Sequence, residues 1–218
     1  MSIAENPLVG RMKGSMANFT TYTLNGKNIV RSKPFKVRDA QTVDQLIMRA
    51  RMKKLAKLYK SLKPVIVMGF TDDSFPKLPE NIYTDSPYNL FVKANFSFAF
   101  ETIEDMPVTV YPLLLLSRGT LPEVTVIDAV TNTDGITIQY DAELLPEVTF
   151  AIDEIIACAK LKDGSLLIAR QMRGYDTIGT IFLKFHVPDA AEVECCYVFA
   201  RSWDGKKVSN STYVKVRE

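Results

Sequence analysis

Apolar residues follow different patterns along the chain. Near the N-terminus, Phe19–Leu24 and residues 27–31 flank Asn25-Gly26, the dipeptide that best accepts the positive φ angles of a type I′ hairpin turn. Residues 42–63 have an apolar period near 3.6, and short apolar runs separated by turn signals follow later in the chain. The sequence therefore predicts a hairpin, a long helix and then a β-rich region.

The helical segment has a defined start and end. Thr42, with Gln45 three residues later, forms a capping box that satisfies orphan amide groups in the first turn. Lys63-Pro64 is expected to end the helix, because the residue before a proline disfavours the helical conformation. The apolar positions form one stripe: Val43, Leu46, Ile47, Ala50, Leu55, Leu58, Tyr59 and Leu62.

A second candidate helix follows a loop rich in Pro and Asp. Ser86-Pro87 has the pattern of an N-cap and a first helical residue. The abundance of phenylalanine as far as Phe100 also suits a strand, so both alternatives stay open for residues 86–100. Two acidic clusters come later in the chain, and such clusters usually mark solvated turns: Glu101, Glu104 and Asp105, and then Asp153 and Glu154.

Beyond Pro107 the chain has the pattern of an antiparallel β-sandwich. Eight β-type runs cover residues 108–118, 124–131, 135–141, 155–162, 165–172, 180–187, 194–203 and 208–217. Asp163-Gly164 and Asp204-Gly205 are hairpin-turn signals, and no helical pattern separates the runs. We therefore expect an α+β protein that is mostly β, with a basic hairpin-helix module at residues 1–106 and an immunoglobulin-like sandwich at residues 107–218.

Two segments of this region resemble fibronectin type III domains. Residues 135–140 are similar to the second strand of that family, with Tyr140 where a tryptophan is usual. Residues 197–201, followed by Gly205 and Ser209, are similar to its last hairpin. The resemblance supports the sandwich and implies little about function.

The strand that contains residues 194–203 also allows a prediction of burial. Residues 197, 199, 201 and 203 lie on one face of a strand, because side chains alternate with a period of two. We expect Tyr197 and Phe199 to be buried and Trp203 to lie at the edge. Arg201 must then pack its aliphatic stem among the aromatic rings or leave the core.

The N-terminal part resembles an uncharacterised bacterial family, a domain of unknown function. The shared pattern is a Gly-rich start, a hairpin, Arg-x-Lys-Pro, and a Thr-x-x-Gln helix with Arg four residues on. The matching residues here are Gly10, Gly14, Asn18, residues 30–34, Thr42, Gln45, Leu46, Arg49, Ala50, Gly69 and Phe70, and downstream residues 116–122 and 208–214. The chain departs from the family at Asp39-Ala40-Gln41, where Asn-Pro-Arg is common. Similar Thr-x-x-Gln-x-x-x-Arg segments resemble phage-type structural proteins, which implies a component of a particle.

Charge is divided unevenly along the chain. Residues 1–70 carry 14 Lys and Arg against three acids, a net charge of +11, and the remaining 148 residues carry −9. Arg49, Lys53, Lys57 and Lys60 form a basic ridge on one side of the predicted helix. Such a ridge can contact phosphates or remain a solvated face. The charge division favours self-association over nucleic-acid binding, with residues 88–100 expected to supply the apolar contact area.

Residues able to carry out catalysis are few. His186 is the single histidine and lies in an apolar run, where a structural role is expected. Neither a zinc-ligand spacing nor a Gly-rich phosphate loop occurs. Cys195 and Cys196 point to opposite faces of a strand, so both cannot face Cys158; reduced thiols are expected, although one disulfide to Cys158 is conceivable. We expect no enzyme activity, no cofactor, no metal and no small-molecule substrate.

The sequence contains neither a signal peptide nor a membrane-spanning run, so a soluble chain that is cytoplasmic as synthesised is expected. The favoured hypothesis is a structural or protein-interaction protein, in a phage-like or other assembly. The alternative is a nucleic-acid-binding accessory protein that uses the basic helix at residues 42–63.

Overall fold

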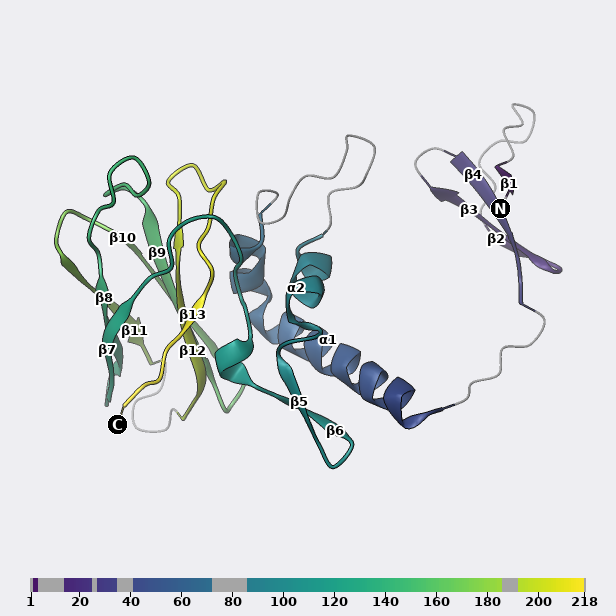
Figure 1. Cartoon of the computed structure of the whole chain (residues 1–218), viewed down its shortest axis with the longest axis horizontal. Helices are drawn as coiled ribbons and strands as arrows, with labels where there is room; N and C mark the ends of the chain where they lie inside the picture. Colours follow the sequence, from purple (N-terminus) through teal and green to yellow (C-terminus); the bar gives the residue numbers. More distant parts are fainter. Residues whose placement is uncertain are drawn as a thin grey trace. The chain divides into compact units, whose positions relative to one another are not determined.

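The chain divides into two compact units. The structure, a computed structural model, describes residues 2–3, 14–24, 27–34, 41–71, 86–185 and 192–217. The units are Met1–Thr42 and Val43–Glu218. This division falls earlier than the expected boundary at 106/107, because both helices pack on the C-terminal sheets and belong to the second unit (Figure 1).

The first unit contains a small antiparallel sheet with strand order β1-β4-β3-β2. Its strands are β1 (Ser2–Ile3), β2 (Gly14–Met16), β3 (Phe19–Leu24) and β4 (Lys27–Ser32). Leu24 pairs with Lys27, so the predicted hairpin is confirmed. The turn dipeptide Asn25-Gly26 itself lies outside the described residues.

The second unit contains an antiparallel β-sandwich. One sheet has the order β11-β8-β7 and the other has the order β10-β9-β12-β13. The strands are β7 (Val126–Asn132), β8 (Gly135–Asp141), β9 (Glu154–Leu161), β10 (Leu166–Met172), β11 (Ile178–Lys184), β12 (Val193–Arg201) and β13 (Thr212–Tyr213). The expected mostly-β α+β class and the antiparallel C-terminal region are confirmed.

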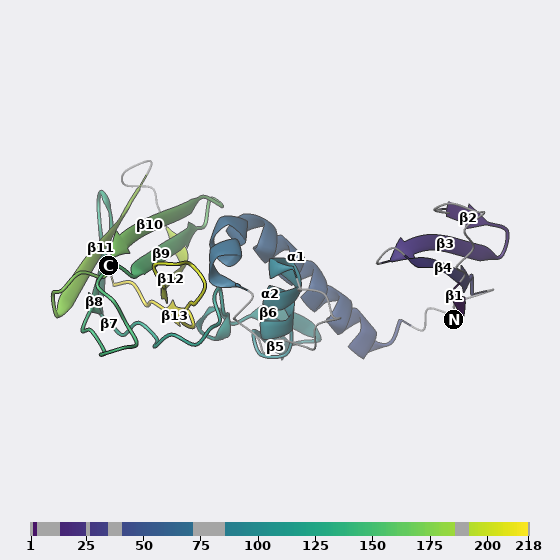
Figure 2. The same cartoon turned by 90° about the horizontal axis from the view of Figure 1, so that it is seen from above.

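The two inner strands of the four-stranded sheet, β9 and β12, are buried on both faces. Cys196, Val198 and Ala200 of β12 pack between the two sheets, whereas Tyr197 and Phe199 face the helices. Figures 1 and 2 show the resulting layers in order: three-stranded sheet, four-stranded sheet, helices. Double burial explains why β9 and β12 read as nearly continuous apolar runs and not as alternating ones.

The predicted register of β12 is confirmed. Tyr197 and Phe199 are at most 1% exposed, and Trp203, just after the strand, is 64% exposed. Arg201 leaves the core at the sheet edge and forms an ion pair with Glu154 at 3.8 Å.

Helix α1 (Val43–Gly69) begins immediately after Thr42, as the predicted cap requires, but its predicted end is wrong. The helix continues through Pro64 for another turn and a half. The carbonyl of Lys60, which Pro64 cannot bond, lies on an exposed side where water can satisfy it. The residues after the proline include Val65 and Ile66, both fully buried, and this packing offsets the lost hydrogen bond.

The open question at residues 86–100 is resolved as a helix followed by a strand. Helix α2 (Pro87–Asn95) begins at the predicted cap, where the Ser86 hydroxyl accepts a hydrogen bond from the amide of Asn89 at 3.3 Å. A hairpin of β5 (Phe100–Ile103) and β6 (Met106–Thr109) follows. Its turn is Glu104-Asp105, so the first acidic cluster does mark an exposed turn.

Two predicted strands are wrong in extent. The run at 108–118 ends as a strand at Thr109 and continues through a 3₁₀ turn, Tyr111–Leu113, which contains Pro112. The run at 208–217 forms only the two-residue β13 and isolated bridges. In both segments side-chain hydrogen bonds replace much of the backbone pairing that a strand would use.

These side-chain hydrogen bonds join residues 116–124 to residues 209–212. The Ser211 hydroxyl accepts from the Leu116 amide at 2.8 Å, and the Ser117 hydroxyl donates to the Ser209 carbonyl at 2.7 Å. The side-chain oxygen of Asn210 accepts from the Gly119 amide at 3.3 Å. We call this set of bonds the polar zipper. Residues 116–122 and residues 208–214 thus lie side by side.

Glycine allows the backbones to approach at the zipper. A Cβ on Gly119 would lie 2.0 Å from the carbonyl oxygen of Val208, and one on Gly69 would lie 2.3 Å from that of Leu116. Neither position tolerates a side chain without a backbone shift. The end of α1 is therefore held directly against the zipper.

All three cysteines are free thiols and buried. Cys158 and Cys195 lie on the helix side of the sheet and Cys196 lies between the sheets, as the strand period predicts. Burial raises the pKa of Cys195 to about 11 and raises the pKa values of the other two thiols as well. The thiols are therefore protonated and unreactive at neutral pH.

Asn95 offers a test of the contact between α2 and the zipper. It is fully buried, donates to the carbonyls of Phe91 and Leu115, and accepts from the Leu115 amide at 2.7 Å. Asn95→Ala leaves these buried backbone groups unpaired and should lower the free energy of unfolding by about 2–3 kcal/mol. Urea denaturation followed by circular dichroism measures the change. Asn89→Ala, an exposed change on the same helix, should have little effect, and equal losses would contradict this role.

The buried thiols predict a loss of stability in alkali. A thiol whose pKa is higher in the folded than in the unfolded protein stabilises the fold fully below about pH 8.5, and this contribution falls as the pH rises. Above about pH 8.5, each such thiol should lower the free energy of unfolding by about 1.4 kcal/mol for every pH unit. For Cys195 this decrease should stop near pH 11. Urea midpoints across a pH series measure this, and Cys195→Ala should reduce the slope below pH 11. An unchanged slope would mean that this thiol is accessible in the folded state.

Candidate protein-interaction site

The structure places the predicted basic ridge on the exposed side of α1. Arg49, Lys53, Lys57 and Lys60 are all exposed. By helical geometry they lie opposite Leu55 and the other buried residues of α1. The ridge is therefore present as expected, on a side that packs against no other described element of the second unit.

Two neighbouring cations have a structural role. The Arg51 guanidinium donates to the Thr102 hydroxyl at 3.3 Å, and the Lys54 ammonium donates to the Pro107 carbonyl. Both bonds hold the β5–β6 hairpin against α1. They lie on a different side of the helix from the ridge.

The apolar contact area expected at residues 88–100 is largely absent from the surface. Leu90, Phe91 and Ala94 are buried against α1 and the sheet. Phe98 is an exposed exception. A group of exposed apolar side chains lies elsewhere on the second unit, on the loops at one end of the sandwich.

Three loops meet at this end of the sandwich, and Asp153 joins them (Figure 1, upper end). Its buried carboxylate accepts from the Phe150 amide at 2.8 Å in the β8–β9 loop and from the Trp203 amide at 3.1 Å in the loop after β12. Its carbonyl accepts from the Arg173 amide at 2.7 Å in the β10–β11 loop. We call the surface made by residues 142–153, 173–177 and 202–207 the loop end.

The loop end presents large apolar side chains to solvent. Trp203 is 64% exposed, Phe150 is 48% exposed and Tyr175 is 88% exposed. Val148, Phe150 and Trp203 line one hollow of about 270 Å³. An apolar group with polar surroundings on loops tied to a rigid core is typical of a protein-binding surface.

The surroundings of this apolar group are mostly acidic. The exposed acids near it are Asp141, Glu143, Glu147, Asp176 and Asp204, and the exposed cations are Lys206 and Lys207. Glu147 has a φ of 62°, a conformation that costs a non-glycine residue about 1–3 kcal/mol. The loop end therefore combines aromatic anchors, negative charge and local backbone strain.

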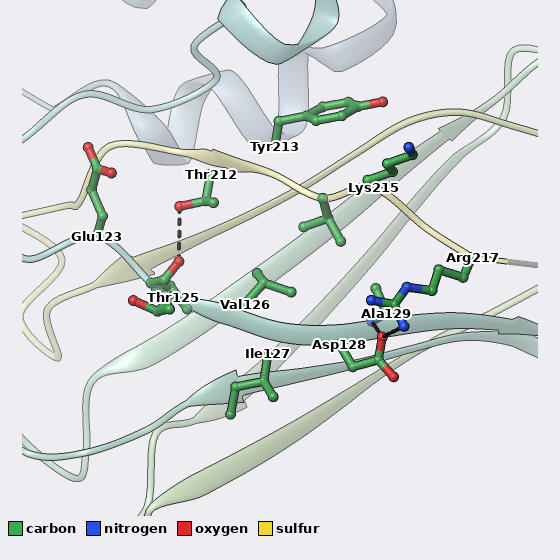
Figure 3. A pocket seen from close by; sticks show the side chains of 12 residues that line it. Glu123, Thr125, Val126, Ile127, Asp128, Ala129, Thr212, Tyr213, Lys215 and Arg217 are labelled. Carbon is green, nitrogen blue, oxygen red and sulfur yellow. Dashed lines mark hydrogen bonds and ion pairs between the residues drawn. The ribbon is translucent and has the colours of Figure 1, made fainter.

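A second hollow lies at the sandwich edge, between β7 and the C-terminal segment (Figure 3). Its volume is about 430 Å³. One end is closed by the Thr212 hydroxyl, which donates to the Val124 carbonyl at 3.0 Å, and the other by the Arg217–Asp128 ion pair at 3.6 Å. Arg217 also exchanges backbone hydrogen bonds with Ala129 and Thr131. These bonds tie the C-terminal segment to β7 and cover part of its edge.

The described residues contain neither a cluster of metal ligands nor a membrane-spanning helix. Within them, no group of three or more His, Cys, Asp or Glu could hold a metal ion. His186 lies outside the described residues. In the described part of the chain, no helix combines the length and the apolar character needed to cross a membrane.

Asp153 should control the rigidity of the loop end. Asp153→Ala removes the acceptor of two backbone amides and should lower the free energy of unfolding by about 2–3 kcal/mol. Trp203 is the single tryptophan of the chain, so its fluorescence anisotropy reports on the loop directly. The variant should show lower anisotropy under native conditions. Asp176→Ala, an exposed change in the neighbouring loop, should leave both measurements unchanged; the same loss in both variants would exclude Asp153 as the joining residue.

Sequence reasoning missed the loop end, because its residues come from three separated loops. The available signals were Trp203 beside an Asp-Gly turn and the apolar residues of the long β8–β9 loop. Comparisons of the chain with protein-family models, with curated proteins and with solved structures gave no match.

Proposed function

We propose that this chain is a non-enzymatic interaction protein, and that its sandwich binds another protein through the loop end. The observation that carries the proposal is the exposed group of Phe150, Tyr175 and Trp203 on three loops joined at Asp153. Trp and Tyr are over-represented among residues that dominate binding energy at protein interfaces. The acidic surroundings favour a partner with a basic rim around an apolar patch.

The strand arrangement supports assigning the sandwich to the immunoglobulin-like and fibronectin type III class. Seven strands in two antiparallel sheets have the orders β11-β8-β7 and β10-β9-β12-β13. Domains of that class carry binding loops at the ends of the sandwich. The β8–β9, β10–β11 and post-β12 loops correspond to such a set.

A role in a phage-like or other assembly belongs to the same proposal. Rigid loops that bind one partner, joined to a separate N-terminal unit, suit a component that links neighbouring proteins. The resemblance to an uncharacterised bacterial family adds no activity to this.

The second candidate function is nucleic-acid binding by α1. The observation that favours it is the exposure of all four ridge cations on one side of the helix. Arg49 and Lys60 lie about 16 Å apart along the axis, enough to follow several phosphates of one strand. Binding would be independent of sequence and steeply dependent on salt.

Site-specific photo-crosslinking in cells tests the main proposal. A photoreactive residue in place of Trp203 or Tyr175 should capture a defined protein, and one in place of Asp163, at the other end of the sandwich, should not. Trp203→Ala should weaken binding of the purified partner at least about 30-fold, as expected for a dominant interface residue. Asp163→Ala serves as the control. Equal capture from both ends, or unchanged affinity of Trp203→Ala, would contradict the proposal.

A DNA gel-shift series tests the second candidate function. It compares the wild type with the double variant Lys53→Glu/Lys57→Glu. Tight, salt-sensitive binding that this variant loses would make nucleic acid the primary partner.

A further inference from the structure

The first three turns of α1 carry apolar side chains that no described element of the second unit covers. Val43 is 53% exposed and Leu46 is 48% exposed. Ile47 and Ala50 are only partly buried, whereas Leu55, which lies on a different side of the helix, is fully buried. The beginning of α1 extends beyond α2 and the β5–β6 hairpin (Figure 2). We call Val43, Leu46, Ile47 and Ala50 the open stripe.

Charges of opposite sign lie on the two sides of the open stripe. On one side is the β5–β6 hairpin, held by Arg51 and Lys54, whose exposed acids are Glu101, Glu104 and Asp105. On the other side is the basic ridge, with Lys53 and Lys57 nearest to the stripe by helical geometry. The order around the helix is thus acidic hairpin, then Ile47, Val43 and Ala50 of the stripe, and then the basic ridge, whose side Leu46 shares.

The acidic turn of the hairpin is kept at an energetic cost. Glu104 and Asp105 have φ values of 48° and 61°, which glycine and asparagine adopt more readily. Within the described residues, no ion pair holds Glu101, Glu104 or Asp105. Strained residues without a structural partner are a recurrent feature of binding surfaces.

We propose that the open stripe binds the same stripe of a second copy, in a two-fold dimer with the two α1 helices parallel. A two-fold axis along the helices brings equal residue numbers to the same level and exchanges the two sides of the stripe. The hairpin contacts α1 at residues 51 and 54, so its acids reach the level of Lys53 on the partner copy. Flanking charges of this kind set the orientation of paired helices.

Charge complementarity selects the parallel arrangement. In an antiparallel pair the two-fold axis is perpendicular to the helices, so ridge meets ridge and hairpin meets hairpin. Like charges would then face each other along the whole contact, which opposes association. This surface is separate from the loop end, so dimerisation and binding of a different protein at the loops do not exclude each other.

Cysteine crosslinking tests the dimer and its direction. The native thiols are buried, so an introduced cysteine is the reactive one in the folded protein. Val43→Cys and Ala50→Cys, about 10 Å apart along the axis, should each form a disulfide-linked dimer under mild oxidation. Met52→Cys, on the other side of the same helix, should not. Crosslinking at one of the two stripe positions alone would indicate an antiparallel pair and overturn the proposal.

Sedimentation velocity across a concentration series measures association without a crosslink. Leu46→Asp should abolish the dimer, and Lys53→Glu or Glu104→Lys should each weaken it at least about twofold, the lower end of measured coupling between contacting residues. The double variant Lys53→Glu/Glu104→Lys should recover most of that loss. Circular dichroism confirms folding of each variant. A monomer at every concentration, or failure of the double variant to recover, would overturn the proposal, whereas the loop-end crosslinks would be unaffected.

Discussion

The fold depends on one sheet that must be covered on both faces. The inner residues of β9 and β12 are buried almost without interruption, with Cys196 and Val198 on one face and Tyr197 and Phe199 on the other. If either face were exposed, several large apolar side chains would lose their burial. Each would lower the free energy of unfolding by about 1.5–3 kcal/mol. The three-stranded sheet covers one face, and α1 and α2 cover the other. The helices are therefore part of the sandwich unit, although they precede it in sequence.

The polar zipper determines where these layers sit. Ser117 and Ser209 are fully buried and fully bonded, and both Gly69 and Gly119 lie too close to neighbouring backbone to accept a side chain. Apolar packing alone would tolerate small shifts between layers, but buried hydrogen bonds require a defined geometry. The zipper thus fixes the end of α1 against the sandwich, with α2 joined to it through Asn95.

Among the described apolar side chains that lie outside the core, two groups are candidates for binding. One is the loop end, where Asp153 holds Trp203 and Phe150 in place, and the other is the open stripe at the start of α1. Both are bordered by charge, which favours chosen partners and discourages unspecific association. We propose a different partner for each surface, a second copy for the stripe and another protein for the loops. Such a chain would join molecules.

Local patterns in the sequence were sufficient for much of the fold. The hairpin around residues 25–26, the start of α1 after Thr42, the Ser86 cap and the alternation of β12 depend on nearest neighbours, which a single sequence contains. The end of α1 was mispredicted, since the rule that proline ends a helix yields when Val65 and Ile66 are buried by a distant sheet. Residues 208–217 were expected to form a longer strand, because their hydrogen-bond partners around residues 116–119 lie some ninety positions away.

The basic ridge followed directly from helical spacing and lies on the side predicted for it. The loop end could not be predicted from local spacing. Its residues come together only when three loops meet at one end of the sandwich: Phe150, Asp153, Tyr175 and Trp203. For the open stripe, the apolar pattern could be predicted from the sequence, but its exposure could not. Its residues are as apolar as those of the buried half of α1, and only the tertiary structure shows that nothing described in its unit packs over its first three turns. Periodicity determines which side of an element is apolar, whereas the length of the neighbouring elements decides how much of that side is covered.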